Sequence, residues 1–287
     1  MLNPTLLELF RLLKNLYSSR LYSKKLTFSG HIYLKSLLNT GLTRSGEVIR
    51  LTLDLGLTPH ILEKGNWQQE VSRFVSQGAM KFSDVLVLDL GAHVGTITRQ
   101  TILEMERTHI DSNVHFVCVE PNNREFANLQ FNLKPFNNCS LVNLGIHPID
   151  NEINLTPDWI NSGNSTTLNH TISSYRKMKM ETKQAVSLGN LLKMFESDIP
   201  IIIKSDLEGL DIAVLQNLDL ANWSRIERFA VELYGHLEVD ILGIHTNLEN
   251  FDLFWPNSET PISLERLIEM SRDEFISSSD LYAIRKV

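Results

Sequence analysis

Short apolar runs and longer amphipathic segments take turns along the chain from residue 83 onward. Near-continuous apolar runs are typical of strands buried on both faces, and apolar residues at helical spacing indicate helices packed on such a sheet. The expected strands span residues 85–90, 114–120, 140–146, 199–206 and 229–234. The expected helices between them span residues 96–106, 124–133, 188–195 and 209–218. This alternation predicts a Rossmann-like, doubly wound α/β fold around a parallel sheet.

The C-terminal residues depart from that alternation. After an expected helix at 264–272, residues 275–277 and 281–285 both have the pattern of short strands, and a Ser-rich tight turn separates them. Two strands this close in sequence indicate an antiparallel pair. We therefore expect the parallel sheet to carry a C-terminal β-hairpin.

The N-terminal part has patterns of its own. Residues 4–17 place apolar side chains on one side of a helix and charged ones on the other, so this helix needs an apolar partner surface. We expect it to pack on the body of the protein or to join two copies into a homodimer. One or two strands are expected within 47–57, and a helix at 70–77. Residues 1–78 are thus predicted to form an N-terminal helix and cap segment, and residues 79–287 the main domain.

Composition and charge narrow the class of partners. The 287 residues include 27 Lys and Arg against 34 Asp and Glu, which gives a formal charge of −7. Binding to a nucleic-acid backbone needs a basic surface, so no nucleic-acid partner is expected. No apolar run approaches the ~20 residues of a membrane-spanning helix, so no membrane span is expected either. Cys118 and Cys139 are expected to be reduced thiols in a cytoplasmic protein, because nothing in the sequence directs export.

The densest chemical signal follows the first of the alternating strands, which ends in the sequence Asp89-x-Gly91-x-x-x-Gly95. Gly91 permits a sharp turn, and Gly95 permits close approach of the backbone to a ligand at the helix start. The dinucleotide fingerprint G-x-G-x-x-G is absent, so this loop is poorly suited to a pyrophosphate. It suits S-adenosylmethionine, which has no phosphate and whose cationic groups favour a nearby carboxylate such as Asp89.

A second carboxylate ends the next expected strand. Glu120 occupies the position from which an acidic residue accepts hydrogen bonds from a ribose diol in nucleotide-binding folds. Together, the glycine loop and this acid predict a binding site for a nucleoside-type cofactor at the carboxyl ends of the strands.

Candidate catalytic groups follow the fourth and fifth expected strands. Asp206 and Glu208 follow one strand and are candidates for removing a proton from an acceptor, and His236 follows the other. Lys204 lies in an apolar strand, so it is expected to pair with a carboxylate or to reach the substrate. Two alternatives stay open here. Asp206 and Glu208 could serve the helix that follows, as its N-cap and its first-turn acid, or both could join Glu232 in binding magnesium, although the spacing is not specific for a metal.

Three of these motifs resemble those of the FkbM-type family of S-adenosylmethionine-dependent methyltransferases, over residues from about 65 to 234. The loop from Asp89 to Gly95 is similar to the family's D-x-G-A-N-x-G, with His93 in place of the usual Asn. Glu120-Pro121-Asn122 resembles its E-P-N, and the stretch 204–211 resembles its K-I-D-x-E-G-x-E. Glu70 and Glu232 also lie where the family tends to carry Glu.

The resemblance implies a sheet of the class I methyltransferase type that binds S-adenosylmethionine. By the same resemblance, Ala92, His93, Pro121 and Asn122 join the cofactor site. Family members commonly methylate hydroxyls of sugars, polyketides or peptides, which implies a small-molecule, glycan or peptide acceptor. The alternatives are N-methylation of an amide or amine of a peptide natural product, an NAD- or nucleotide-binding enzyme, and a non-catalytic Rossmann-like protein that binds a nucleotide.

Overall fold

The computed structural model describes residues 41–42, 48–52, 57–108, 112–156, 181–195, 198–233, 244–273 and 279–286. Three predictions fall outside these residues: the amphipathic helix at 4–17, the strand at 275–277 and the position of His236. The homodimer predicted from that helix therefore stays a prediction. Within the described residues, no helix combines the length and the apolar character that crossing a membrane requires.

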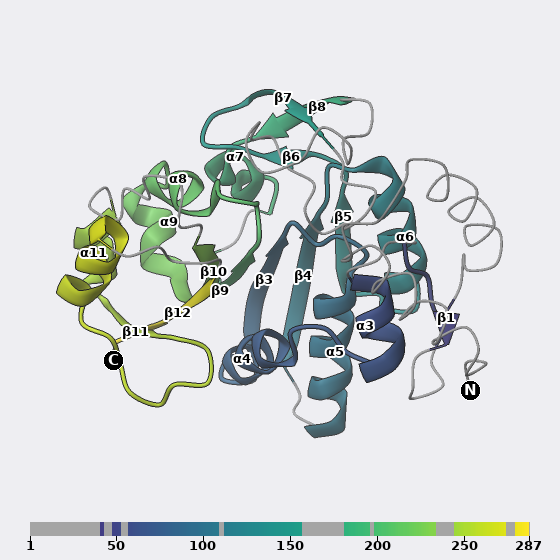
Figure 1. Ribbon diagram of the computed structural model, residues 1–287, viewed down its shortest axis with the longest axis horizontal. Coiled ribbons are helices and arrows are strands. Elements are labelled where there is room, and N and C mark those ends of the chain that lie inside the picture. Colours follow the sequence, from purple (N-terminus) through teal and green to yellow (C-terminus); the bar gives the residue numbers. More distant parts are fainter. Residues whose placement is uncertain are drawn as a thin grey trace, which may run out of the picture.

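A seven-stranded sheet forms the centre of the molecule (Figure 1). Its strands are β3 (Asp84–Leu90), β4 (Asn113–Val119), β5 (Cys139–Val142), β9 (Ile201–Ser205), β10 (Ile226–Leu233), β11 (Phe251–Phe254) and β12 (Ser279–Arg285). Their order across the sheet is β11-β12-β10-β9-β3-β4-β5. The pairs from β10 to β5 are parallel, whereas β12 runs antiparallel to both β10 and β11. This is a Rossmann-like, doubly wound α/β arrangement with one antiparallel strand inserted near an edge of the sheet.

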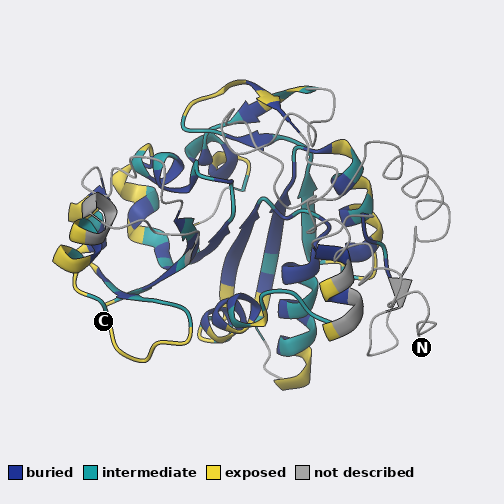
Figure 2. Cartoon of the chain, in the orientation of Figure 1, coloured by how far each residue is buried: buried dark blue, intermediate teal, exposed yellow. Residues whose placement is uncertain are grey.

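Helices cover both faces of this sheet, as the alternating pattern predicted. One face carries α4 (Gln69–Ala79), α5 (Thr96–Thr108) and α6 (Asn123–Leu133). The other carries α7 (Leu188–Lys193), α8 (Asp211–Gln216), α9 (Leu220–Arg225), α10 (His245–Leu248) and α11 (Leu264–Asp273). Buried residues follow the strands through the middle of the molecule (Figure 2), so the core consists of two apolar layers with the sheet between them.

Strand β3 shows why the apolar runs become central strands. Val85 and Val87 face the layer under α4 and α5, whereas Leu86 and Leu88 face the layer under α7 and α8. All four are at most 2% exposed. Burying each such side chain contributes about 1.5 to 3 kcal/mol. A strand with one solvent-exposed face would gain this contribution only from every second residue. Polar side chains cap some of the helices: Asn122 caps α6 by accepting a hydrogen bond from the Arg124 amide at 3.0 Å.

The structure corrects the predicted C-terminal hairpin. The last strand, β12, is antiparallel as expected, but it lies between β10 and β11, and these two strands occupy its two edges. Its partner β11 therefore precedes α11 in the chain, whereas the predicted partner at 275–277 follows it. The correct pairing was not visible because Phe251–Phe254 is only four residues long and alternates weakly.

Two smaller sheets accompany the central one. The strand expected at 140–146 is two strands, β5 in the central sheet and β6 (Gly145–Ile146) in a three-stranded sheet with β7 (Asn151–Leu155) and β8 (Glu181–Val186). Figure 1 shows this small sheet beyond one end of the central strands. Among the described residues of 47–57, β2 (Val48–Ile49) is the strand; it pairs with β1 (Gly41–Leu42), and helix α3 (Leu57–Lys64) already begins at residue 57.

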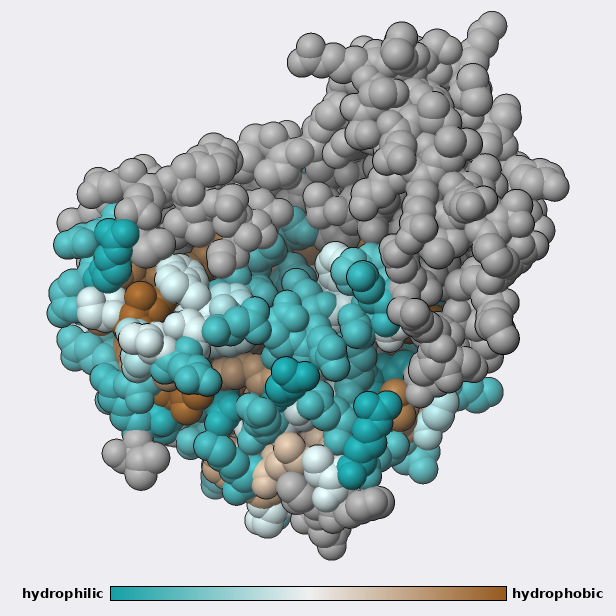
Figure 3. Space-filling view, turned by 60° about the horizontal axis from the view of Figure 1, so that its bottom comes forward, coloured by the Kyte–Doolittle hydropathy of each residue, from teal (hydrophilic) through white to brown (hydrophobic). Residues whose placement is uncertain are grey.

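The described surface is mainly hydrophilic. In the view of Figure 3, hydrophobic residues form small, separate patches among hydrophilic ones. Among the described residues, the exposed large apolar side chains lie far apart in the sequence: Phe131, Ile149, Met194 and Leu220. Scattered exposure of this kind is normal for a folded protein.

Candidate functional site

A cleft opens at the carboxyl ends of β3, β4, β9 and β10, where the chain passes from one half of the sheet to the other. In open parallel sheets this crossing point is where ligands bind. About 1190 Å³ of the cleft, its open mouth included, is free of protein atoms. Eight of the predicted site residues line it, namely Gly91, Ala92, His93, Glu120, Pro121, Lys204, Asp206 and Glu208.

The loop from β3 to α5 forms one wall of the cleft, and the backbone itself holds it in place. Gly91 has a φ of 72°, and an added Cβ atom there would lie 2.0 Å from the carbonyl oxygen of Asp206. The amides of Gly91 and Ala92 both donate to the carbonyl of Val119, at 3.0 and 2.9 Å. The loop is therefore packed between the ends of β4 and β9, and only glycine fits at its first position.

Asp89 and Lys204 form a buried ion pair under this loop. The Lys204 Nζ atom lies 3.1 Å from Asp89 Oδ1 and donates to the carbonyl of Gly91 at 2.8 Å. The other carboxylate oxygen of Asp89 accepts a hydrogen bond from the Thr98 hydroxyl at 2.6 Å. Burial alone would lower the pKa of Lys204, but the carboxylates of Asp89 and Asp206 outweigh it and raise that pKa. Lys204 is thus a permanent cation that holds the loop, which makes it unsuitable as a base.

Glu120 lies at the end of β4 with both carboxylate oxygens facing backbone amides. Oε2 accepts from the amide of His93 at 2.9 Å, and Oε1 accepts from the amide of Asn122 at 2.8 Å. Burial, with a smaller contribution from the nearby Glu125 carboxylate, raises the pKa of Glu120 to about 8. Each carboxylate oxygen has a further lone pair, so the group can accept hydrogen bonds from a bound diol. The side-chain Nδ2 of the adjacent Asn122 is buried without a hydrogen-bond partner among the described residues.

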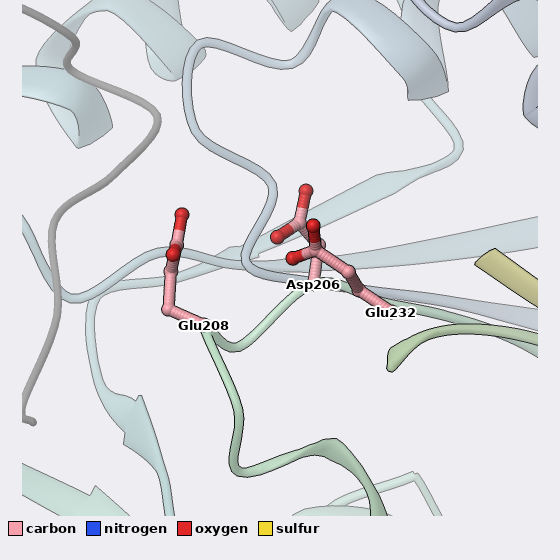
Figure 4. A group of neighbouring side chains, drawn as sticks. All are labelled: Asp206, Glu208 and Glu232. Carbon is pink, nitrogen blue, oxygen red and sulfur yellow. The ribbon is translucent and has the colours of Figure 1, made fainter. Parts of the chain in front are cut away.

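Three carboxylates meet on the opposite side of the cleft. Asp206 follows β9, Glu208 lies in the turn after it, and Glu232 is on β10. One carboxylate oxygen from each lies within 4.8 Å of the others, and Figure 4 shows Glu232 reaching across toward Asp206, with Glu208 on the other side of Asp206. Glu208 has a φ of 53°, which is uncommon for a residue other than glycine. An arrangement of this kind can bind a cation or accept a proton from a bound hydroxyl or amine.

The acidic character extends to the neighbouring strand β12. Asp280 is opposite Glu232 in the antiparallel pair, where side chains are close neighbours. Burial, together with the Asp206 carboxylate, raises the pKa of Asp280 to about 6. The hydroxyl of Tyr282, two residues on, is buried with no hydrogen-bond partner in the described part of the chain. Sequence reasoning did not identify Asp280, because its proximity to the cleft depends on the pairing of β12 with β10.

The structure also decides which carboxylate serves helix α8. This helix begins at Asp211, later than the residue 209 that the sequence indicated. Asp211 accepts hydrogen bonds from the Ser205 hydroxyl at 2.5 Å and from the Leu207 amide at 3.2 Å. Burial raises the pKa of Asp211 to about 7. Asp206 therefore does not cap the helix, and its side chain, 30% exposed, faces the cleft.

The remaining predicted residues support the cleft without lining it. Asp89 is buried beneath the loop, Asn122 caps α6, and Gly95, with a φ of 82°, packs against Leu129. Apolar parts of the wall come from elements that the sequence did not connect with the site. They are Leu57 and Trp67 from the N-terminal side, and Ile146, Ile153 and Leu155 from the small sheet. The polar–apolar alternation of residues 151–155 would have indicated β7, but not its position over the cleft.

No model of a known protein family matches the sequence, and no curated protein matches it. Among solved structures, the chain is similar to the precorrin-6y C5,15-methyltransferase of Geobacter metallireducens, with 14% identity, 76% of this chain and 89% of that chain covered, and a TM-score of 0.38. It is similar to the 23S rRNA methyltransferase ErmE, with 12% identity, coverage of 77% and 69%, and a TM-score of 0.39. An rRNA methylase from Streptococcus thermophilus has 9% identity, coverage of 75% and 93%, and a TM-score of 0.39. At these identities the likeness is one of fold.

Proposed function

We propose that this protein is an S-adenosylmethionine-dependent methyltransferase that transfers the methyl group to a hydroxyl oxygen. The observation that carries the proposal is the position of Glu120 beside the glycine loop at the crossing point of the sheet, with both carboxylate oxygens at the cleft. The motif resemblance to the FkbM-type family supports a sugar, polyketide or peptide-type metabolite as the acceptor.

The loop itself favours this cofactor over a dinucleotide. A pyrophosphate site uses free backbone amides at the start of a helix. Here four of the loop amides are bound within the protein: those of Gly91 and Ala92 by Val119, that of His93 by Glu120, and that of Gly95 by Ala92. The residues present therefore fit a ligand that offers hydroxyl donors and positive charge, and they do not fit one that brings phosphate oxygens.

When bound, S-adenosylmethionine supplies a methyl group on a positively charged sulfur. The chain's own residues must hold the ligand, align the acceptor and take up a proton. Glu120 holds the ribose through hydrogen bonds to its two hydroxyls, and the Lys204–Asp89 pair keeps the loop in place beneath it. Asp206 would take the proton that the acceptor hydroxyl loses when its oxygen receives the methyl group from the cofactor, whose neutral thioether would be the leaving group.

Calorimetry with S-adenosylhomocysteine, the product form of the cofactor, tests the proposal. We expect the wild-type protein to bind it and Glu120→Ala to bind it at least about tenfold more weakly, because leaving the two ribose hydroxyls without their acceptor costs about 1 to 3 kcal/mol. Glu249→Ala is the matched control, because this glutamate is exposed at the end of α10, away from the cleft. It should bind like the wild type.

Two outcomes contradict the proposal. One is the absence of S-adenosylhomocysteine binding to the wild-type protein together with tight binding of NAD, which would make the cleft a dinucleotide site. The other is equal binding by the wild type and Glu120→Ala, which would move the ribose contact away from the end of β4.

A further inference from the structure

Glu125 lies where three parts of the chain meet. It belongs to the first turn of α6, and its side chain is only 1% exposed. Its carboxylate accepts hydrogen bonds from the Thr52 hydroxyl and from Arg124 Nε, the latter at 2.9 Å. Its Oε2 atom also lies 3.5 Å from Nε2 of His93. A carboxylate this deeply buried depends on such partners, because an unpaired charge in the interior is very costly.

His93 connects this carboxylate to the cofactor loop. Its backbone has a φ of 50°, a left-handed conformation that surrounding contacts must maintain in a residue other than glycine. In this conformation its amide donates to Glu120 Oε2. The side chain and the backbone of His93 therefore contact two different carboxylates, Glu125 under the loop and Glu120 at the cleft. A change at the imidazole will alter the direction of the amide.

Thr52 connects the same carboxylate to the N-terminal side of the cleft. Residues 48–52 lie along α6, where the amide of Arg50 donates to Asn132 Oδ1 at 2.7 Å and Asn132 Nδ2 donates to the Arg50 carbonyl at 2.8 Å. The same Nδ2 donates to the carbonyl of Val94 in the loop, at 2.7 Å. A few residues further on, Leu57 lines the cleft. The glycine loop and the segment 48–52, which leads to the N-terminal wall of the cleft formed by Leu57 and Trp67, are thus hydrogen-bonded to the same residue of α6.

We propose that Glu125 is a positioning residue for cofactor binding: through His93 it aims the loop amide at Glu120, and through Thr52 it fixes the N-terminal wall to the loop. This rests on the proposed function, since it assigns Glu120 to the ribose. The motif that the family resemblance emphasises has Asn at position 93, and an Asn side chain is too short to replace Nε2. The His93–Glu125 contact is therefore a feature of this chain's own residues.

The test compares two replacements of the same histidine. In His93→Gln the side-chain amide nitrogen stands near the position of Nε2 and can still reach Glu125, whereas in His93→Asn it cannot. Asn also tolerates the left-handed backbone well, so His93→Asn should keep the thermal stability of the wild type. We expect His93→Asn and Glu125→Gln each to weaken S-adenosylhomocysteine binding about tenfold, and His93→Gln to stay within about twofold of the wild type.

A double variant tests whether the two residues act as one unit. The pair His93→Asn with Glu125→Gln should bind no more weakly than either single variant, because the second change removes a contact that the first has already broken. His115→Asn is the control; this histidine lies in β4, bonds to Ser140 at 2.9 Å and does not line the cleft. Equal weakening by Asn and Gln at position 93, or losses that multiply in the double variant, would overturn the proposal.

Hydrogen exchange separates this proposal from the proposed function, because it needs no ligand. In the unliganded protein, Glu125→Gln should speed amide exchange in both residues 48–52 and the loop 91–95, while His115→Asn should leave both unchanged. Unchanged exchange in the Glu125→Gln protein would overturn the positioning role even if the cofactor binds. A wild type that binds no S-adenosylhomocysteine, but shows the coupled exchange, would instead overturn the proposed function alone.

Discussion

Replacing Gly91 by alanine is expected to damage both stability and ligand binding. The residue has a φ of 72°, and a left-handed conformation costs an L-residue about 1 to 2 kcal/mol. The new Cβ atom would lie 2.0 Å from the carbonyl oxygen of Asp206, and this neighbour is backbone that cannot rotate away. Overpacking of this kind typically costs about 1 to 3 kcal/mol. The smaller entropy of the unfolded alanine chain offsets about 0.4 to 1 kcal/mol, so a net loss of about 1 to 4.6 kcal/mol is expected.

Urea denaturation followed by circular dichroism measures this loss. The urea concentration at the midpoint should fall while the m-value changes little, because unfolding exposes nearly the same surface area in both proteins. Two other glycines provide a graded comparison. Gly95 also has a positive φ, but its new Cβ atom would meet the side chain of Leu129 at 2.6 Å, which can yield, so Gly95→Ala should lose less. Gly189 in α7 has no atom within 4 Å of an added Cβ, and Gly189→Ala should gain about 0.5 to 1 kcal/mol.

The relative stabilities of the three alanine variants test whether Gly91 is packed against the Asp206 carbonyl. If Gly91→Ala unfolds at the wild-type urea midpoint, the loop is not packed against the end of β9 as described. If it is destabilised no more than Gly95→Ala, the overlap with the Asp206 carbonyl is not the dominant effect. In either case, no distortion of the loop would remain to explain why Gly91→Ala should bind S-adenosylhomocysteine more weakly.

Three further predictions concern carboxylates of the cleft. Because burial raises the pKa of Glu120 from 4.5 to about 8, the native state binds more protons than the unfolded state between these values, so this group lowers stability as pH rises through that window. In urea titrations, the free energy of unfolding of Glu120→Gln should therefore rise relative to that of the wild type between pH 5 and pH 8. If the difference between the two proteins is the same at every pH, Glu120 is not a buried group that titrates in this window. Asp206→Asn should keep its affinity for S-adenosylhomocysteine, while turnover, followed by mass spectrometry of the methylated acceptor, falls about 10² to 10⁴-fold. Wild-type turnover should survive EDTA, and its loss with recovery on adding magnesium would show that Asp206, Glu208 and Glu232 bind a metal instead.

Much of the central sheet could be predicted because its strands are buried on both faces. The runs at 85–88 and 201–203 are apolar without interruption, and neither propensity nor burial competes with the strand conformation there. The glycine loop and Glu120 were also predictable, because chain order places them directly after strands, and parallel strands end at the same edge of the sheet. These features depend on local sequence and on a topology rule.

The features that could not be predicted depend on pairing between distant segments. Asp280 comes close to Asp206 and Glu232 because β12 inserts between β10 and β11, and no local pattern specifies that insertion. The same is true of Leu57, which reaches the cleft because residues 48–52 are fastened to α6. Lys204 was predicted to pair with a carboxylate or to reach the substrate. It pairs with Asp89, and its contact with the Gly91 carbonyl follows from the adjacency of β3 and β9.

The charges around the cleft suggest how binding and chemistry are divided between residues. Lys204 balances Asp89 at 3.1 Å but is 4.0 Å from Asp206, and Asp280 has a raised pKa partly because Asp206 is near. A cation bound among these carboxylates relieves their repulsion. Methyl transfer removes the positive charge from sulfur, so this attraction strengthens the reactant complex and weakens the product complex. The attraction between the carboxylates and the positively charged sulfur is greatest in the reactant complex. It therefore does not lower the activation barrier, which falls only through interactions that are stronger in the transition state than in the reactant complex. Under the proposed function, the carboxylates would therefore serve cofactor capture and product release as a group, and acceleration of the transfer would come from alignment and from proton removal by Asp206.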